Sequence, residues 1–196
     1  MVEINRKTKE TDIKCKLNLD GCGKININTG VGFFDHMLEA LSKHSGIDID
    51  LTCSGDLHID AHHTVEDCGI VLGQALKKVI FPISAVERYG NATVVMDEAA
   101  TTCALDLSNR PFLVYEVNVS GKVGDFDVEL AEEFFHALSG NAGLTVHIIS
   151  DRGRNKHHIL EASFKAFAVA LRRALLKNER LGIPSTKGVL WLNLLF

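Results

Sequence analysis

The chain contains one short pattern of histidine and glutamate twice, and this duplication narrows the folds that are open to it. His62-His63-Thr64-Val65-Glu66 corresponds to His157-His158-Ile159-Leu160-Glu161, at an offset of 95 residues. Phe34-Asp35-His36 corresponds in the same way to Phe134-Phe135-His136, at an offset of 100 residues. Self-similarity at a fixed spacing marks repeated supersecondary units, so we infer a duplicated half-domain of roughly 90 residues.

The apolar periodicity runs in the same order in both halves: strands, helix, strand, helix. In the first half it predicts strands over 13–19 and 24–27, a helix over 31–45, a strand over 47–51 and a helix over 61–81. In the second half it predicts strands over 93–96, 103–107 and 113–119, a helix over 128–138 closed by Ser139-Gly140-Asn141, a strand over 144–148 and a helix over 155–176.

Each sheet must bury its apolar face against another element, so the two halves are expected to cover each other. We predict an α+β fold: an internally duplicated half-domain, with two mixed β-sheets and the helices packed between them. Residues 1–90 are predicted to form the first repeat, residues 91–190 the second, and residues 191–196 an apolar C-terminal tail.

The composition excludes several classes of function. A formal net charge of -4 over 196 residues provides no basic field for nucleic acid or an anionic membrane. No apolar stretch approaches the roughly 18 residues that a membrane helix needs, and the N-terminus shows no apolar signal segment. Five cysteines without a CxxC pattern are typical of unpaired thiols in a reducing compartment. We therefore expect a cytoplasmic protein that binds neither nucleic acid nor a membrane.

The doubled His-His-x-x-Glu pattern indicates a metal site. On a helix, residues three and four apart share a face, so both histidines can reach the region of the glutamate. Successive imidazoles point about 100° apart, which suits two neighbouring ions better than one. Together with His36 and His136, the two copies supply six histidines and two glutamates, which divide into two sets of three imidazoles and one carboxylate.

Four protein ligands on an octahedral ion leave positions for substrate or water, which is typical of a catalytic site. The donors are nitrogen and oxygen without thiolate, so Mn²⁺, Fe²⁺ or Zn²⁺ fits better than copper(I) or an iron–sulfur cluster. The alternative is a repeat whose histidines are purely structural. His58 lies near the first pair and is a candidate to support a ligand, whereas His44 and His147 are expected to cap or pack.

Several further motifs carry a resemblance to a known family. They are Gly32-Phe33-Phe34-Asp35-His36-Met37-Leu38, Gly55-Asp56-Leu57-His58-Ile59-Asp60-Ala61-His62-His63-Thr64-Val65-Glu66-Asp67, Met96-Asp97-Glu98-Ala99, Leu107-Ser108-Asn109-Arg110-Pro111, the segment from His157 to Phe167, and Pro184-Ser185-Thr186-Lys187-Gly188. From about Arg6 to Leu190 the chain resembles imidazoleglycerol-phosphate dehydratase. It departs from the family at Asn109, where glycine is usual, and in its apolar C-terminal end.

The resemblance implies roles for individual residues. The metal ligands would be His36, His62, His63, Glu66, His136, His157, His158 and Glu161, with two Mn²⁺ in each active site. The first histidine of each pair would serve one ion, and the second histidine with its glutamate the other. Glu10 would be the first candidate for proton transfer and Asp97 the second. The substrate and its phosphate would contact Glu10, Arg88, Arg110, Lys165, Ser185 and Lys187.

The resemblance also implies an activity and an assembly. The enzyme would be a lyase of L-histidine biosynthesis that dehydrates imidazoleglycerol phosphate to imidazoleacetol phosphate, in a homo-oligomer of 24 subunits with active sites at subunit contacts. Two metals on the ring nitrogens would favour the imidazolate, whose electron density can expel the adjacent hydroxyl and give a diazafulvene-like intermediate.

Two other functions compete with this interpretation. A metal-storage protein on the same fold would take up metal without turnover, but it has no use for a phosphate site made of Arg88, Arg110 and Lys187. A dinuclear hydrolase with a bridging hydroxide would normally carry several carboxylate ligands, and the predicted set has only Glu66 and Glu161.

Overall fold

The computed structural model describes residues 1–188 and 190, so the predicted tail at 191–196 lies outside the described residues. The first half contains β1 (Val2–Lys7), β2 (Thr11–Asn18), β3 (Ile25–Asn28), α1 (Gly32–Ser45), β4 (Asp48–Gly55) and α2 (His62–Ile80). Its four strands form one sheet in the order β1-β2-β4-β3, in which β3 runs parallel to β4 and the other neighbours are antiparallel.

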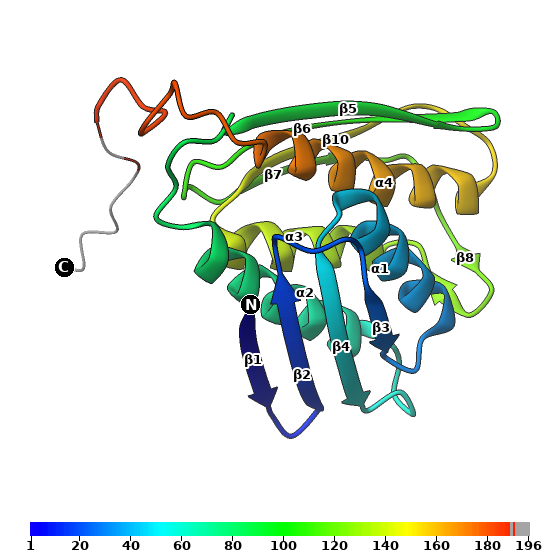
Figure 1. Cartoon of the computed structure of the whole chain (residues 1–196). Coiled ribbons are helices and arrows are strands. Elements are labelled where there is room, and N and C mark those ends of the chain that lie inside the picture. The colour runs from blue at the N-terminus through cyan, green and yellow to red at the C-terminus, as the bar shows by residue number, and fades with distance from the viewer. Residues whose placement is uncertain (189, 191–196) are drawn as a thin grey trace.

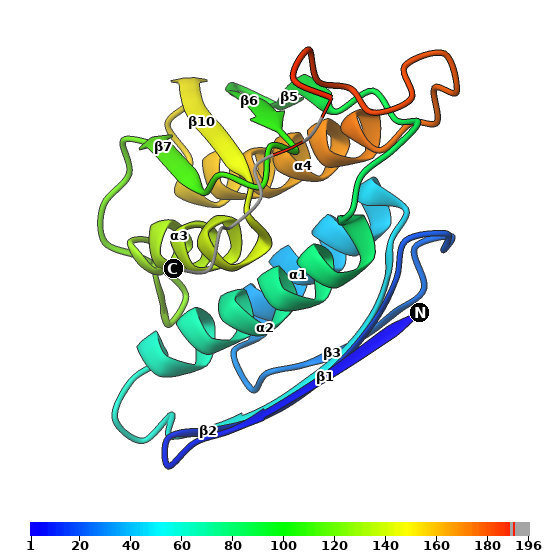
Figure 2. The same cartoon turned by 90° about the vertical axis from the view of Figure 1, so that its left-hand side faces the viewer.

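The second half repeats this topology. It contains β5 (Tyr89–Met96), β6 (Ala99–Asp106), β7 (Phe112–Glu116), the short hairpin β8 (Lys122–Val123) and β9 (Phe126–Asp127), α3 (Leu130–Ala142), β10 (Thr145–Arg152) and α4 (Lys156–Ala174). The sheet order is β5-β6-β10-β7, with β7 parallel to β10. Figures 1 and 2 show the helices in the space between the two sheets, which confirms the predicted α+β class.

The helices of the two halves pack across the repeat. α1 from the first half contacts α4 from the second, and α2 contacts α3. Two glycines of α2 allow a close approach to α3: a Cβ at Gly69 would lie 2.8 Å from the carbonyl oxygen of Phe134, and one at Gly73 would lie 2.6 Å from that of Leu138. Each predicted set of metal ligands can therefore contain histidines from both halves of the chain.

Two local expectations were wrong. The segment Ser139-Gly140-Asn141 does not end α3, which continues to Ala142 and stops at Gly143 in the left-handed conformation with φ 72°. Gly140 costs helix stability, but Ala142 is fully buried, and such packing overrides intrinsic propensity. The strand predicted over 113–119 ends at Glu116, and the β8–β9 hairpin follows before α3. The division of the repeats at residue 90 stays a prediction.

None of the helices in the described part of the chain combines the length and apolarity that crossing a bilayer requires.

Candidate metal and substrate site

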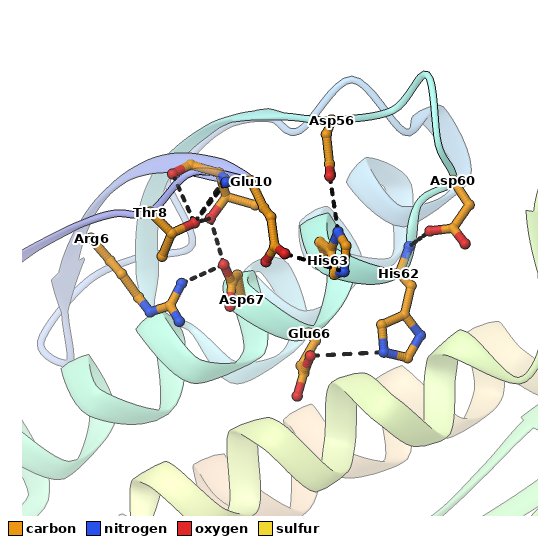
Figure 3. Close-up of polar contacts among 10 residues, drawn as sticks. Arg6, Thr8, Glu10, Asp56, Asp60, His62, His63, Glu66 and Asp67 are labelled. Atoms are coloured by element: carbon orange, nitrogen blue, oxygen red, sulfur yellow. Dashed lines mark hydrogen bonds and ion pairs between the residues drawn. The ribbon is translucent and has the colours of Figure 1, made fainter.

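The first histidine pair opens α2. The carboxylate of Asp60 accepts a hydrogen bond from the backbone N–H of His62 at 2.8 Å, which satisfies one of the free donors at the helix start. Nδ1 of His63 lies 3.0 Å from a carboxylate oxygen of Asp56, and Nε2 of the same ring lies 3.8 Å from Oε1 of Glu10. Nε2 of His62 lies 3.8 Å from Oε2 of Glu66, one helical turn later (Figure 3).

A polar network fixes the turn that carries Glu10. The hydroxyl of Thr8 accepts hydrogen bonds from the backbone N–H groups of Glu10 and Thr11, at 3.1 and 3.0 Å. Asp67 on α2 is only 6% exposed, and its carboxylate accepts hydrogen bonds from Arg6 and from the Thr11 hydroxyl. The network joins the β1–β2 turn to the first turns of α2, so Glu10 is held near His63 (Figure 3).

The second histidine pair opens α4 in a similar way. Asn155 caps the helix, because its side-chain oxygen accepts the backbone N–H of His157 at 2.9 Å. Nδ1 of His158 lies 2.8 Å from Oε2 of Glu98, and Nε2 lies 3.9 Å from Oδ2 of Asp97. The other oxygen of Glu98 accepts the backbone N–H groups of Arg154 and Asn155, at 3.0 and 2.7 Å. These backbone hydrogen bonds, with that of His158, lower the pKa of Glu98 to about 2.

The structure brings one group of three candidate ligands together in the described part of the chain. Ligand atoms of His36, His157 and Glu161 all lie within 4.8 Å of one another. Nε2 of His157 is 3.0 Å and Nε2 of His36 is 3.5 Å from Oε2 of Glu161, so two imidazoles and a carboxylate converge as a divalent cation requires. The donor set fits Mn²⁺.

Lys165 occupies the other oxygen of this carboxylate. Its ammonium lies 2.6 Å from Oε1 of Glu161, a residue that is only 6% exposed. Burial acts to raise the pKa of Glu161, but Lys165, His157 and His36 outweigh it and hold that pKa below its usual value. Lys165 therefore contacts a candidate metal ligand, although the resemblance implied a phosphate contact.

The pairing of histidines with ions stays a prediction. The resemblance placed Glu161 with the second histidine of its pair, whereas its carboxylate contacts the first, His157, in this structure. His136 lies on the exposed side of α3, the helix that packs on α2.

Arg88 is held tightly at the start of β5. Its guanidinium binds both carboxylate oxygens of Asp106, at 2.7 and 3.0 Å, and donates to the carbonyl of Pro184 at 2.6 Å. Asp106 raises the pKa of Arg88, and the residue has a φ of 70°, a strained value for a side chain of this size. Arg88 thereby brings the loop with Ser185 and Lys187 to this end of the sheet.

Four of the predicted phosphate contacts, Arg88, Arg110, Ser185 and Lys187, lie at one end of the second sheet, and the predicted proton-transfer residue Asp97 lies at the other. Tyr89, Asp106, Thr145 and Phe112 form one row across the strands, next to Arg88 and Arg110. Asp97 and Glu98 form the turn at the other end. Seven residues at about 3.3 Å each separate the two ends by about 23 Å.

Comparisons with known proteins show which family the chain is similar to. The family model for imidazoleglycerol-phosphate dehydratase matches residues 29–171. The imidazoleglycerol-phosphate dehydratase of Aliarcobacter butzleri (strain RM4018) is 96% identical over 190 residues, covering 97% of this chain and all of that protein. The one from Sulfurovum sp. (strain NBC37-1) is 65% identical with the same coverage. The chain belongs to the imidazoleglycerol-phosphate dehydratase family.

Solved structures of the dehydratase family share the fold. The enzyme from Pyrococcus furiosus in complex with (S)-C348 superposes with a TM-score of 0.83 at 40% identity, covering 95% of this chain and all of that one. The enzyme from Staphylococcus aureus subsp. aureus N315 gives a TM-score of 0.80 at 41% identity, covering 91% of this chain and all of that one. All eight candidate metal ligands lie within residues 29–171, whereas Glu10, Ser185 and Lys187 lie outside that range.

Several residues that shape the dehydratase site had no signal of their own in the sequence. Asp56 and Glu98 lie within the family motifs, but only the structure shows that each contacts a histidine ring. Asp67 and Asp106 hold Arg6 and Arg88 in place across long sequence separations. Asn109 has a φ of 56°, a left-handed conformation that favours glycine, the residue that the resemblance leads us to expect at this position.

Proposed function

We propose that the chain dehydrates imidazoleglycerol phosphate to imidazoleacetol phosphate in L-histidine biosynthesis, as a metal-dependent lyase. The observation that carries the proposal is the convergence of His36, His157 and Glu161 in a member of this family. Six histidines and two glutamates would hold two Mn²⁺ in each active site. When bound, the ions would polarise the substrate's imidazole ring and favour its imidazolate form, from which a diazafulvene-like intermediate can arise.

The chain's own carboxylates are suited to move the protons. Loss of water requires a proton to leave a carbon and another to reach the departing hydroxyl, which positioned carboxylates can mediate. Glu10 is half-exposed and lies 3.8 Å from Nε2 of His63, and the network of Thr8, Thr11 and Asp67 supports its turn. We assign it the principal proton transfer. Asp97 is 81% exposed and is the second candidate.

The separation of about 23 Å along the second sheet supports an active site shared between subunits. One small phosphorylated substrate cannot reach Asp97 and the loop with Ser185 and Lys187 of the same chain. We propose that Arg88, Arg110, Ser185 and Lys187 bind the phosphate beside another subunit's metal ligands, within a homo-oligomer of 24 subunits. All five cysteines are unpaired in the structure, which supports a cytoplasmic location.

Turnover of imidazoleglycerol phosphate by the purified protein tests the proposal. We expect activity with Mn²⁺, loss of activity after chelation and recovery when Mn²⁺ returns. His158→Ala should lower the amount of bound metal and abolish turnover while the subunit still folds. A chelated, verifiably metal-free protein with full activity would exclude the metal-dependent lyase, and metal uptake without turnover would favour the storage function.

A further inference from the structure

The second histidine of each pair has a carboxylate on the ring nitrogen that faces away from the proton-transfer candidate. On His63, Asp56 occupies Nδ1 at 3.0 Å and Glu10 faces Nε2 at 3.8 Å. On His158, Glu98 occupies Nδ1 at 2.8 Å and Asp97 faces Nε2 at 3.9 Å. Both halves therefore have a close carboxylate at Nδ1 and a more distant one toward Nε2.

Duplication alone does not account for this agreement, because the two Nδ1 carboxylates come from different positions of the repeat. Lys7 is paired with Asp12 across β1 and β2, and Val95 is paired with Ala100 across β5 and β6. Each pair has four residues of chain between its two members. The third enclosed residue is Glu10 in one turn and Glu98 in the other, so these two are equivalent in the strand register. They nevertheless face different nitrogens of their rings.

At the offset of 95 residues that relates the two histidine pairs, the counterpart of Asp56 is Asp151, but its carboxylate accepts a hydrogen bond from the hydroxyl of Thr102. The loop between β10 and α4, residues 153–155, contains neither aspartate nor glutamate. Glu98, from the neighbouring turn, contacts the ring of His158 instead. The same contact thus arises from two unrelated positions, as expected if the contact itself is required.

We propose that Asp56 and Glu98 are positioning residues that fix the tautomers of His63 and His158, with the proton on Nδ1 and Nε2 left bare. A carboxylate offers only acceptors, so Nδ1 has to be the donor in each contact. A neutral imidazole with Nδ1–H can bind a metal only through Nε2, and a hydrogen bond to the other nitrogen orients a metal-binding histidine. The inference rests on the proposed function, since it assigns these rings a metal.

The two contacts differ in a way that makes the inference testable. Both oxygens of Glu98 are engaged, one by the ring and one by the backbone N–H groups of Arg154 and Asn155. In Glu98→Gln one of these partners must face an amide NH2, which donates hydrogen bonds and cannot accept one. Asp56 uses one oxygen for the ring, and its Oδ1 is buried without a hydrogen-bond partner among the residues that the structure describes. In Asp56→Asn the carbonyl oxygen is therefore free to turn toward Nδ1.

The experiment measures Mn²⁺ affinity by equilibrium dialysis of the full-length oligomer. We expect Glu98→Gln to weaken the binding of the ion held through His158 by about tenfold or more, and Asp56→Ala to do the same for His63. Asp56→Asn should keep wild-type affinity. Asp151→Asn is the matched control, because within the described residues 1–188 and 190 the hydrogen bond of that carboxylate is with the hydroxyl of Thr102 and not with a histidine.

Solid-state ¹⁵N spectra of histidine-labelled apoprotein separate a tautomer effect from simple damage to the loop. Signals assigned through His63→Ala and His158→Ala should show a bare Nε2 in the wild type, and the His158 signal should move to the opposite tautomer in Glu98→Gln. Wild-type rings protonated on Nε2, or a Glu98→Gln variant with unchanged affinity, would overturn the inference. A wild-type protein that binds no Mn²⁺ would instead overturn the proposed function, while the spectra would still report the ring orientation.

Discussion

The two helices that open with a histidine pair share a sequence pattern but surround their glutamates differently. Glu161 on α4 is buried and contacts His36, His157 and Lys165. Glu66 on α2 is 43% exposed and lies 3.8 Å from His62, and Ile70 stands where α4 has Lys165. One copy of the repeat is assembled within a single chain, whereas the other stays open at the surface. In the homo-oligomer proposed above, this open copy is where a second subunit would complete a site.

The largest expected effect concerns the carboxylates that face Nε2 of His63 in the first half and Nε2 of His158 in the second. Glu10→Gln should lower kcat by about 10²- to 10⁴-fold, because the amide keeps the shape of the side chain but cannot transfer the proton. Asp97→Asn should lower kcat less, since Asp97 is 81% exposed and its turn lacks the Thr8–Thr11–Asp67 network. Steady-state kinetics with saturating Mn²⁺ give both values. A greater loss in Asp97→Asn would exchange the two roles.

The second prediction tests the close packing that distinguishes α2 from α4. Gly73→Ala places a Cβ 2.6 Å from a backbone oxygen of Leu138, so α3 has to move, at a cost of about 1–3 kcal/mol in the free energy of unfolding. α4 already carries Ala168 at the corresponding position. Gly140→Ala in α3 is the control: a Cβ there meets nothing within 4 Å, and alanine should add about 0.5–1 kcal/mol. Urea unfolding gives the free energy of unfolding of both variants. A Gly73→Ala variant as stable as Gly140→Ala would refute the packing argument.

The third prediction concerns Lys165, which has no equivalent beside Glu66. Lys165→Met should destabilise the metal-free protein by about 2 kcal/mol, because it leaves the carboxylate of Glu161 buried without its ammonium partner. Lys165 is itself partly exposed, which keeps the cost below that of a wholly buried pair. Mn²⁺ should restore much of the loss, since a bound cation stabilises the folded state. Lys78 is an exposed lysine on α2, so Lys78→Met should change the free energy of unfolding little. Equal losses of stability in the two variants would contradict the ion pair of Lys165 with Glu161.

Local periodicity predicted most of the fold, because buried residues recur at every second position in the strands and at every third or fourth position in the helices. The end of α1 at Gly46 and the span of α2 before Pro82 followed from the sequence in this way. The end of α3 did not, since Ala142 is buried by contacts that the sequence does not display. For the same reason the repeat identified candidate ligands but not which helices face each other. That His36 joins Glu161 is a consequence of α1 packing on α4.

The smallest expected effect concerns Asp48 and Thr145, which begin equivalent strands in the two halves. Asp48 opens β4 opposite Asn18, and Thr145 opens β10 opposite Asp106. One oxygen of Asp48 accepts the backbone N–H groups of Lys24 and Cys22, at 2.7 and 2.9 Å, and these bonds lower the pKa of Asp48. Thr145 instead donates its hydroxyl to the carbonyl of Arg110, at 2.9 Å. Similar loops are therefore held by a charged group in one half and a neutral group in the other.

Only the charged contact should depend on pH. A carboxyl whose pKa is lowered by folding adds stability above its unfolded pKa, near 4, and this stability is lost as the pH falls through the lowered folded value. Asp48→Asn should thus lower the free energy of unfolding at pH 7, and the gap to the wild type should narrow as the pH falls below about 4. Thr145→Val should lower it by the same amount at both pH values, because its hydroxyl does not titrate. Urea unfolding at pH 7 and pH 3 gives the comparison, and a gap for Asp48→Asn that stays constant with pH would show that the carboxylate's charge does not hold the loop.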